Sequence, residues 1–382
     1  MMRSFLPLLR GFSSRYSKRV AGCLLAAAGT TTAAYAFTVA NNKPVGQFAF
    51  RFPLMTQCAA KVFPQSSVIN PVKDHSLFLT IHLRPGCTAQ ECLKELGNMQ
   101  KYIDNISPPD LRDESDEIWY GVGFGSKFLN ELGTDYQPAG IVSYTYRTRS
   151  GPHGDLPNTG GDIFIHAKCN ERGKLFELCQ AIMNHMPHGC VAKFEDVYGW
   201  TYRGGRDLTG FMDGTENPAD EDDRIEAAID PKTGGSYVVT QKWIHNHPVI
   251  RATKDGVKEQ YIGRDLKDSV ELRKKPDTSH VARMVGSADF DATPKFQIVR
   301  HSQPWGTVSG DSGLFFIGYS ATPVALDFML DRMTGLGEDK KADDLMRLTQ
   351  CVTGNYWFFP SKPHLDKMIG KAGSGSSFRL WR

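Results

Sequence analysis

The stretch from Gly210 to Pro218 places Asp213 between two glycines and just before an Asn-Pro turn. Glycine adopts backbone conformations that are closed to other residues and lets the chain approach a ligand closely. A carboxylate presented in this way can accept and return a proton, as general acid–base catalysis requires. An Asp-Gly pair is also common in ordinary surface turns. The stretch alone therefore leaves a catalytic and a structural interpretation open.

Two further motifs follow in the C-terminal half. His280 lies in the run Ser-His-Val-Ala-Arg, and Arg300 lies in the apolar run Phe-Gln-Ile-Val-Arg-His. Imidazole is a standard axial ligand of haem iron, whereas arginine keeps its proton and can stabilise negative charge that develops in a reaction. Most histidines are expected to be structural. His166 lies in an apolar strand, and His301 would point away from Arg300 because side chains alternate along a strand.

Other runs share this context, namely Gly-Arg-Asp-Leu-Thr at 205–209, Tyr-Ile-Gly-Arg at 261–264, Gly-Leu-Phe-Phe-Ile-Gly-Tyr at 313–319 and Val-Thr-Gly-Asn-Tyr-Trp-Phe-Phe-Pro at 352–360. Together with the three motifs above, they resemble the dye-decolourising peroxidases, a family of haem enzymes. The resemblance is almost continuous over 200–360 and looser in the N-terminal half, where it rests on 121–125 and 161–166. Within the family, the sequence looks closest to the compact bacterial-type branch.

The resemblance implies one non-covalent haem b per chain, with His280 as the proximal ligand of the iron. It implies that Asp213 is an acid–base group and that Arg300 is a cation above the haem. Leu314 and Phe316 would be apolar residues on the distal side, and Arg264 would be a cation beside a haem propionate. The sequence does not identify the acid that should orient the second nitrogen of His280. Trp305 and Tyr319 are candidate electron carriers.

The reaction implied by the resemblance reduces hydrogen peroxide through a ferryl intermediate and oxidises organic or dye-like reducing substrates. Three alternatives belong to other classes. A haem-handling protein with little turnover would not need both Asp213 and Arg300, and a non-haem ligand-binding protein would show no Soret band. A nucleotide enzyme would use the glycines at 121–125, but their spacing is not Gly-X-Gly-X-X-Gly and no helix N-terminus clearly follows.

Charge is distributed unevenly along the 382 residues, whose formal net charge is +3. Residues 1–50 hold six basic side chains and no acidic one, so the remainder has 39 basic against 42 acidic residues and is close to neutral. Because a nucleic-acid-binding domain carries a strong basic surface, nucleic acid is excluded as a partner. The length and the 40% hydrophobic content suit two domains with separate cores.

The N-terminal 50 residues have the composition of an organellar transit peptide, rich in Arg and Ser and free of acids. Residues 20–40 are mostly apolar, close to the length of about 20 residues that a membrane-spanning helix needs. Three interpretations are open. They are a bipartite mitochondrial signal leading to the intermembrane space or inner membrane, a retained membrane anchor, and a simple presequence or signal for another organelle.

The hydrophobic pattern predicts an α+β fold. Strands are expected at 75–83, 118–124, 141–146, 162–169, 191–198, 237–243, 295–301, 313–319 and 356–359, and helices at 89–103, 174–185 and 323–336. The resemblance implies two tandem ferredoxin-like domains, at 51–199 and 200–382. The haem would lie in the second, where the irregular region 210–275 builds its pocket, and a homo-oligomer is expected.

Eight cysteines are present, without any Cys-X-X-Cys pair. A zinc ribbon, an iron–sulfur site and covalent c-type haem attachment all lack their spacing. Free thiols are therefore expected, and a disulfide framework is not.

Overall fold

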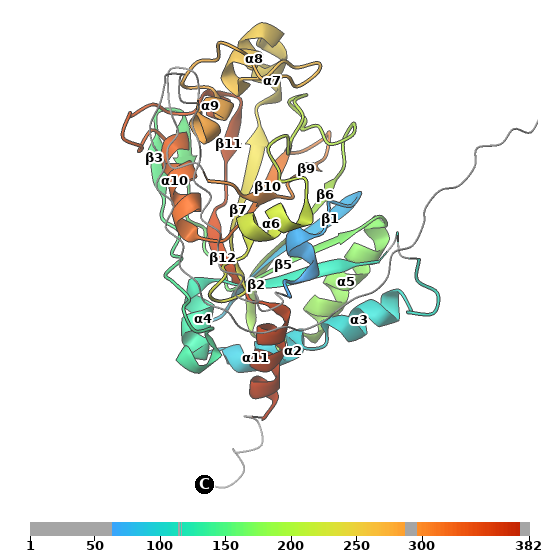
Figure 1. Cartoon of the computed structure of the whole chain (residues 1–382). Helices are drawn as coiled ribbons and strands as arrows, with labels where there is room; N and C mark the ends of the chain where they lie inside the picture. The colour runs from blue at the N-terminus through green and yellow to red at the C-terminus, as the bar shows by residue number, and fades with distance from the viewer. Residues whose placement is uncertain (1–62, 114, 116, 287–295, 375–382) are drawn as a thin grey trace, which may run out of the picture. The chain divides into compact units, whose positions relative to one another are not determined.

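The computed structural model describes residues 63–374 except 114, 116 and 287–295 (Figure 1). The predicted targeting segment 1–50 and the predicted membrane stretch 20–40 lie outside these residues. Among the helices that are described, none has both the length and the apolar character needed to cross a membrane.

The N-terminal half alternates strands with helices. After the short helix α1 (Ser66–Ile69), its elements are β1 (His75–Leu83), α2 (Ala89–Leu96), α3 (Met99–Ile106), β2 (Trp119–Phe124), α4 (Ser126–Leu132), the small hairpin β3 (Arg149–Gly151) and β4 (Gly154–Leu156), β5 (Ile163–Cys169), α5 (Arg172–His185) and β6 (Val191–Trp200).

The C-terminal half repeats this alternation with more helices. Its elements are α6 (Glu221–Ala228), β7 (Ser236–His245), α7 (His247–Ala252), α8 (Asp255–Ile262), α9 (His280–Val285), β8 (Val299–Arg300), β9 (Gln303–Gly306), β10 (Ser312–Ser320), α10 (Pro323–Met333), β11 (Thr349–Cys351), β12 (Asn355–Phe359) and α11 (Lys362–Ser374).

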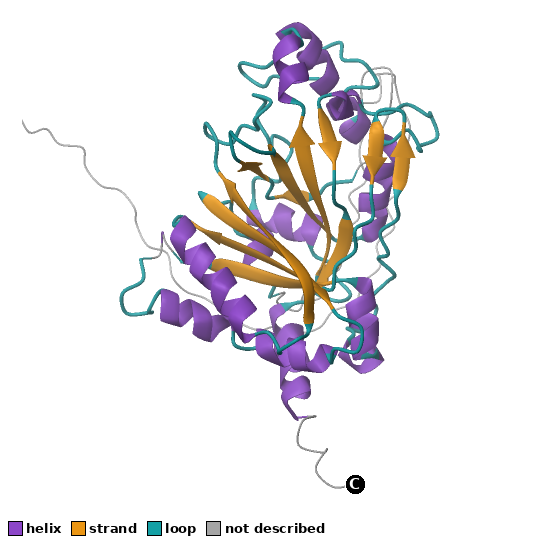
Figure 2. Cartoon of the chain, turned by 180° about the vertical axis from the view of Figure 1, so that it is seen from behind, coloured by secondary structure: helices purple, strands orange, loops and turns teal. Residues whose placement is uncertain are grey.

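Within the described residues, ten strands form one sheet in the order β11-β7-β12-β2-β5-β1-β6-β9-β10-β8. All of its pairings are antiparallel. The two halves meet at single registered pairs, Phe358 with Phe124 and Gly199 with Trp305. An additional pairing of β7 with β10 closes the sheet on itself, so that it encloses an interior. Helices α2, α3, α4, α5, α10 and α11 pack against the outer face of this sheet, whereas α1 and α6 contribute to the interior cluster (Figure 1, Figure 2).

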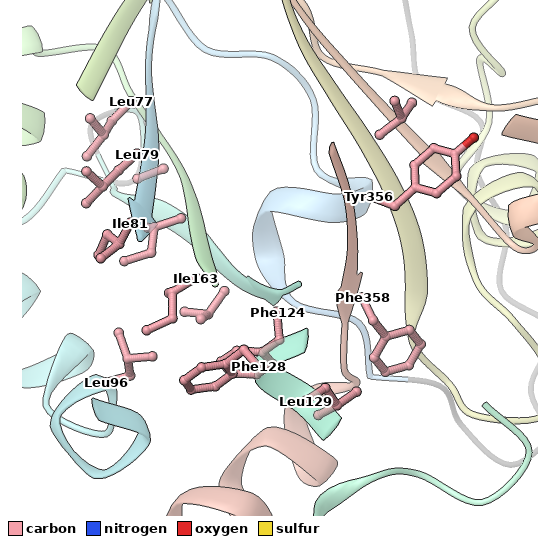
Figure 3. Packing of buried hydrophobic residues seen from close by; sticks show 14 of the residues in the cluster. Leu77, Leu79, Ile81, Leu96, Phe124, Phe128, Leu129, Ile163, Tyr356 and Phe358 are labelled. Carbon is pink, nitrogen blue, oxygen red and sulfur yellow. The ribbon is translucent and has the colours of Figure 1, made fainter. Parts of the chain in front are cut away.

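Alternation along each strand sorts the hydrophobic side chains into an interior and an outer layer. On β1, Phe78 belongs to the interior cluster, where it stacks on Phe315 with ring centroids 4.2 Å apart. Leu77, Leu79 and Ile81 of the same strand face outward and pack with the apolar residues of the covering helices (Figure 3). Both faces of β1 are therefore buried, which requires an apolar residue at most of its positions.

Three predicted elements differ from the structure. The single helix expected at 89–103 is two helices, because α2 ends at Leu96 and α3 begins at Met99. Gly97 between them packs on α11, where a Cβ would lie 2.6 Å from Ile369. No described residue of 141–146 belongs to a strand, although Tyr144 and Tyr146 are buried there. Their alternation reflects an extended segment whose side chains pack on the core without strand pairing. Within the predicted strand 295–301, only Val299–Arg300 is paired as β8.

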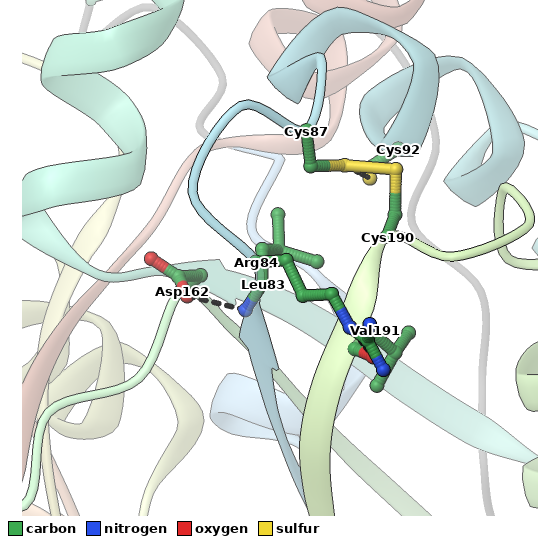
Figure 4. Close-up of a disulfide and its surroundings, with 7 residues drawn as sticks. All are labelled: Leu83, Arg84, Cys87, Cys92, Asp162, Cys190 and Val191. Carbon is green, nitrogen blue, oxygen red and sulfur yellow. Dashed lines mark hydrogen bonds between the residues drawn. A yellow bond between two sulfur atoms is a disulfide. The ribbon is translucent and has the colours of Figure 1, made fainter.

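The expectation of free thiols is wrong for one pair, because Cys87 and Cys190 form a disulfide (Figure 4). The bond joins the loop after β1 to the start of β6, across 103 residues of sequence. Cys92 of α2 lies beside it, with its Sγ 3.5 Å from the Sγ of Cys87. Sequence spacing carries no signal for this pair, since only the antiparallel pairing of β1 with β6 brings the two cysteines together.

Candidate active site

Asp213 lies in a tight turn whose two glycines adopt left-handed backbone conformations, with φ of 99° at Gly210 and 78° at Gly214. The backbone N–H of Asp213 donates to the carbonyl of Gly205 at 3.0 Å. One oxygen of its carboxylate accepts the N–H of Gly214 at 2.7 Å. The carboxylate is 23% exposed, so the turn holds it in a fixed and partly desolvated position.

Arg300 is attached to the same turn through Asn217. The Asn217 side chain donates to the carbonyl of Arg300 at 2.7 Å and accepts the Arg300 N–H at 3.0 Å. This pair of bonds fixes the backbone of β8 against the turn. The guanidinium of Arg300 then lies 3.5 Å from the Asp213 carboxylate. The turn and the strand therefore bring together a carboxylate and a guanidinium that are 87 residues apart in the sequence.

His280 is the first residue of α9, and the side chain of Ser279 caps this helix by accepting the N–H of Ala282. Nδ1 of His280 lies 2.7 Å from Oδ2 of Asp343, whose side chain is completely buried. Among the described residues, none hydrogen-bonds Nε2 of His280, and the side chain is 24% exposed. Asp343 is the orienting acid that the sequence did not identify. Its position 63 residues downstream gave no signal.

Arg264 joins the Asp213 turn to the loop that follows α8. Its guanidinium forms an ion pair with Glu216 and donates to the carbonyl of Ser269 at 2.9 Å. The preceding residue, Gly263, ends α8 so close to α9 that a Cβ would lie 3.0 Å from Ser279 Oγ. Nε of Arg264 is buried and has no hydrogen-bond partner in the part of the chain that the structure describes. One buried donor therefore remains unused at this position.

Leu314 and Phe316 lie on one face of β10, and Phe315 lies on the other. Phe315 is 2% exposed in the enclosed interior, whereas Leu314 and Phe316 are only partly buried and pack against the outer hydrophobic layer. The alternation expected for this strand is confirmed. Both candidate electron carriers, Trp305 and Tyr319, belong to the interior cluster.

Several conspicuous polar residues are structural. Asp207 and His245 are buried and hydrogen-bonded, with Nε2 of His245 2.9 Å from Oδ1 of Asp207, and Thr209 donates to the same carboxylate through its N–H and hydroxyl. Burial alone would raise the pKa of Asp207, but the histidine and these donors outweigh it and lower the pKa. His166 and His301 are buried, and burial lowers the pKa of both well below the usual value. Both are core histidines, as predicted.

The glycines at 121–125 serve packing in β2. A Cβ on Gly121 or Gly123 would lie within 2.9 Å of the Phe359 ring. A helix does follow at Ser126, contrary to expectation, with Gly125 as its N-cap. Because Phe359 fills the space above the glycines, this segment does not form a phosphate-binding loop.

Comparison with known proteins identifies the family. The C-terminal model of Dyp-type peroxidases matches residues 204–364, and the N-terminal model matches residues 65–201. A dye-decolorizing peroxidase of Mycobacterium tuberculosis is 31% identical over 322 residues, covering 80% of this chain and 90% of that protein. One from Mycolicibacterium paratuberculosis is 30% identical over 308 residues, covering 78% and 84%.

Solved structures agree. A dye-decolorizing protein from V. cholerae aligns with a TM-score of 0.70 and 31% identity, over 79% of this chain and 99% of that one. A Rhodococcus jostii DypB variant in complex with heme aligns with a TM-score of 0.69 and 27% identity, over 80% and 98%. The chain belongs to the Dyp-type peroxidase family and has its α+β fold. It is therefore an enzyme, a haem-dependent peroxidase.

The comparisons correct the predicted location. The curated relatives come from Mycobacterium, Mycolicibacterium, Rhodococcus and Brevibacterium, which are bacteria without mitochondria. The mitochondrial location, its organellar alternative and the transit peptide are thus contradicted. They rested on the composition of residues 1–50 alone, and a bias toward Arg and Ser is not specific to organellar signals.

Proposed function

We propose that this enzyme reduces hydrogen peroxide at one non-covalently held haem b per chain and oxidises organic or dye-like reducing substrates. The supporting observation is the pairing of Asp213 with Arg300 at 3.5 Å, together with a histidine whose Nδ1 is held by a buried carboxylate. A peroxidase needs a pair such as Asp213 and Arg300 to move a proton and stabilise charge. It also needs a ligand such as this histidine to hold the metal.

His280 would be the axial ligand. Its Nδ1 is held by Asp343 at 2.7 Å, which assigns the proton to Nδ1 and leaves the Nε2 lone pair for a metal. The buried carboxylate also fixes the orientation of the imidazole ring. These donors fit a haem iron, for which a proximal histidine is a common ligand.

Asp213 and Arg300 would act on peroxide at the opposite face. When bound, haem supplies the two-electron chemistry that reduces peroxide, through the ferryl state that the family resemblance implies. Asp213 would take the proton from one peroxide oxygen and return it to the other, because the turn holds its carboxylate in place. Arg300 would donate hydrogen bonds to the oxygen on which negative charge develops. Asn217 would keep Arg300 in position through the backbone bonds described above.

Three further residues would shape the pocket. Arg264 would bind a haem propionate through its guanidinium, which in this structure pairs with Glu216 and Glu271. Leu314 and Phe316 would form an apolar wall on the peroxide side, where they exclude water and strengthen the electrostatic effect of the cation.

We also propose two ferredoxin-like domains, at 51–199 and 200–382, with the haem in the second. The strand order β2-β5-β1-β6 in the first half and β12-β7-β10-β9 in the second supports this division. Each half places its first and third strands at the centre and its second and fourth at the edges. The predicted homo-oligomer stays a prediction, which sedimentation equilibrium of the full chain tests.

A haem-handling protein with little turnover is the alternative, and the Asp213 and Arg300 pair disfavours it. Such a protein would need His280 but neither of the other two groups.

The first test is haem binding by a His280→Ala variant. We expect its Soret band to be lost or strongly weakened when haem is titrated into the apoprotein. His188→Ala removes an exposed histidine and serves as the matched control, with wild-type binding expected. Wild-type affinity and an unchanged spectrum in His280→Ala would refute the ligand assignment.

A further inference from the structure

Three cysteines of the N-terminal half meet at one end of the β1 and β6 pair, outside the set of residues assigned to haem. Cys87 and Cys190 form the disulfide, and Sγ of Cys92 lies 3.5 Å from Sγ of Cys87. All three sulfur atoms lie within 4.8 Å of one another, and Figure 4 shows Cys92 beside the S–S bond. Among the described residues, no other group of three or more cysteine, histidine or carboxylate side chains brings its ligand atoms this close together. Such a group of sulfur atoms is what a soft metal ion prefers.

The backbone holds two of these cysteines together independently of the disulfide. β1 and β6 pair as far as Leu83 and Val191, and the N–H of Arg84 donates to the carbonyl of Cys190 at 2.8 Å. The N–H of Cys87 donates to the carbonyl of Arg84 at 3.1 Å. With these bonds in place, the Cα atoms of Cys87 and Cys190 lie 5.2 Å apart. Reduction of the disulfide therefore leaves two thiols that face each other.

The third cysteine is fixed by a different element. Cys92 lies in the first turn of α2, where its N–H donates to the carbonyl of Thr88 at 3.3 Å. Its side chain is completely buried in the outer hydrophobic layer. Beyond the end of the helix, Gly97 packs on Ile369 of α11, which holds α2 in place. Because neither anchor involves the S–S bond, the reduced chain presents three sulfur atoms to one point.

An ion reaches this cluster from a neighbouring cavity of about 180 Å³. Cys87 is partly exposed and contributes to the lining of the cavity. Two carboxylates and two cations line it as well, namely Glu131, Asp162, Arg84 and Lys127. Their formal charges cancel, so a cation that enters meets no net positive charge.

The number and type of ligands favour a soft monovalent ion. Structural zinc takes four ligands, whereas this cluster offers three sulfur atoms and includes no histidine or carboxylate. Thiolates select Cu(I) among the ions that accept sulfur ligands, and Cu(I) does not require a fourth one.

We propose that Cys87, Cys92 and Cys190 form a binding site for Cu(I) when the disulfide is reduced. A dithiol gives two electrons and two protons to the S–S bond and becomes a disulfide itself, so that three thiols result. On binding, the thiols release their protons and the sulfur atoms take up the ion, whose oxidation state does not change. The inference does not rest on the proposed function, because none of the three cysteines is assigned to haem or peroxide.

The test measures the copper that the full chain retains with its haem in place. The protein is reduced with a phosphine, which becomes phosphine oxide as the disulfide breaks, and is then desalted under argon. Cu(I) is added in the presence of the competitor bathocuproine disulfonate. Elemental analysis after gel filtration is expected to find about one copper per chain, and X-ray absorption to find sulfur neighbours only. The unreduced protein should retain much less, because its disulfide leaves a single thiol in the cluster.

Cys92→Ser and Cys92→Ala both remove the third ligand and leave the disulfide intact. Loss of a group that only supports a metal ligand weakens binding about 10–100-fold, so loss of a ligand itself should weaken Cu(I) binding at least tenfold. Cys179→Ala removes a buried cysteine of α5 outside the cluster and should bind Cu(I) as the wild type does.

Four results would overturn the inference. They are wild-type Cu(I) affinity in both Cys92 variants, equal copper retention by the unreduced protein, tighter retention of Zn²⁺ than of Cu(I), and loss of the far-UV circular dichroism on reduction. The last of these would show that the fold does not position the three thiols without the disulfide.

Discussion

Replacement of Asp343 by asparagine probes the contact on which the ligand role of His280 depends. The wild-type carboxylate does two things at once. Oδ2 faces Nδ1 of His280 at 2.7 Å, and Oδ1 accepts the N–H of Leu345 at 2.9 Å. An amide of the same shape has one accepting oxygen and one donating nitrogen, so Asp343→Asn can satisfy only one of these two partners.

Each orientation of the amide has a defined cost. If its nitrogen faces His280, it donates to Nδ1, the ring proton moves to Nε2, and the atom that should bind iron is blocked. If its oxygen faces His280, the ring keeps its tautomer but the N–H of Leu345 loses its acceptor, which costs about 0.5–2 kcal/mol. Loss of such a supporting carboxylate typically weakens metal binding about 10–100-fold. We therefore expect a comparable loss of haem affinity and a smaller loss of folding stability.

The assay is a Soret titration of apoprotein with haem, combined with potentiometry of the holoenzyme. The neutral partner makes the histidine less electron-donating, so the midpoint potential should rise, which a purely structural role would not cause. Asp344→Asn changes the adjacent carboxylate, which bonds Thr278 and Arg347 instead, and is expected to keep haem affinity within about threefold. Wild-type affinity and potential in Asp343→Asn would refute the orienting role.

Three further outcomes are expected. Asn217→Ala removes both side-chain bonds to the backbone of Arg300, so the reaction with peroxide should slow about tenfold while the Soret band is kept; an unchanged rate in stopped-flow mixing would contradict this. The folded pKa of Asp207 is lowered, so its contribution to stability is present above about pH 4 and is lost as pH falls through the folded pKa. Asp207→Asn should therefore be about 1–3 kcal/mol less stable at pH 7 by urea unfolding, and the difference should narrow in acid. Replacing Cys87 and Cys190 by serine should lower stability by about 2–5 kcal/mol, and a reductant should then have no further effect.

Short sequence patterns were sufficient for the parts of the fold that depend on local order. The limits of β1 match the predicted strand 75–83, since alternation and flanking residues mark both ends. The left-handed glycines beside Asp213 were likewise predictable, because glycine alone adopts those angles without strain. The prediction of a strand at 141–146 was wrong because strand pairing is not a local property. Tyr144 and Tyr146 alternate toward the core, but strand pairing depends on a neighbour that local alternation does not reveal.

Contacts between residues far apart in the chain could not be predicted from the sequence. Asp343 meets His280, and Cys87 meets Cys190, only because the chain returns to the same place after long excursions. Asn217 was interpreted as a turn residue, and nothing in its neighbourhood predicted that its amide would hold Arg300. The family resemblance supplied the site residues, but it did not provide the partners that orient them.

The most direct test of the account is the rate at which the holoenzyme reacts with hydrogen peroxide, followed at the Soret band in rapid mixing. Asp213→Asn and Arg300→Leu should bind haem normally, because neither residue holds the metal. Their reaction with peroxide should be about 10²–10³-fold slower than that of the wild type, as expected for loss of an acid–base group or of a charge-stabilising donor. Wild-type rates in both variants would contradict the proposed mechanism.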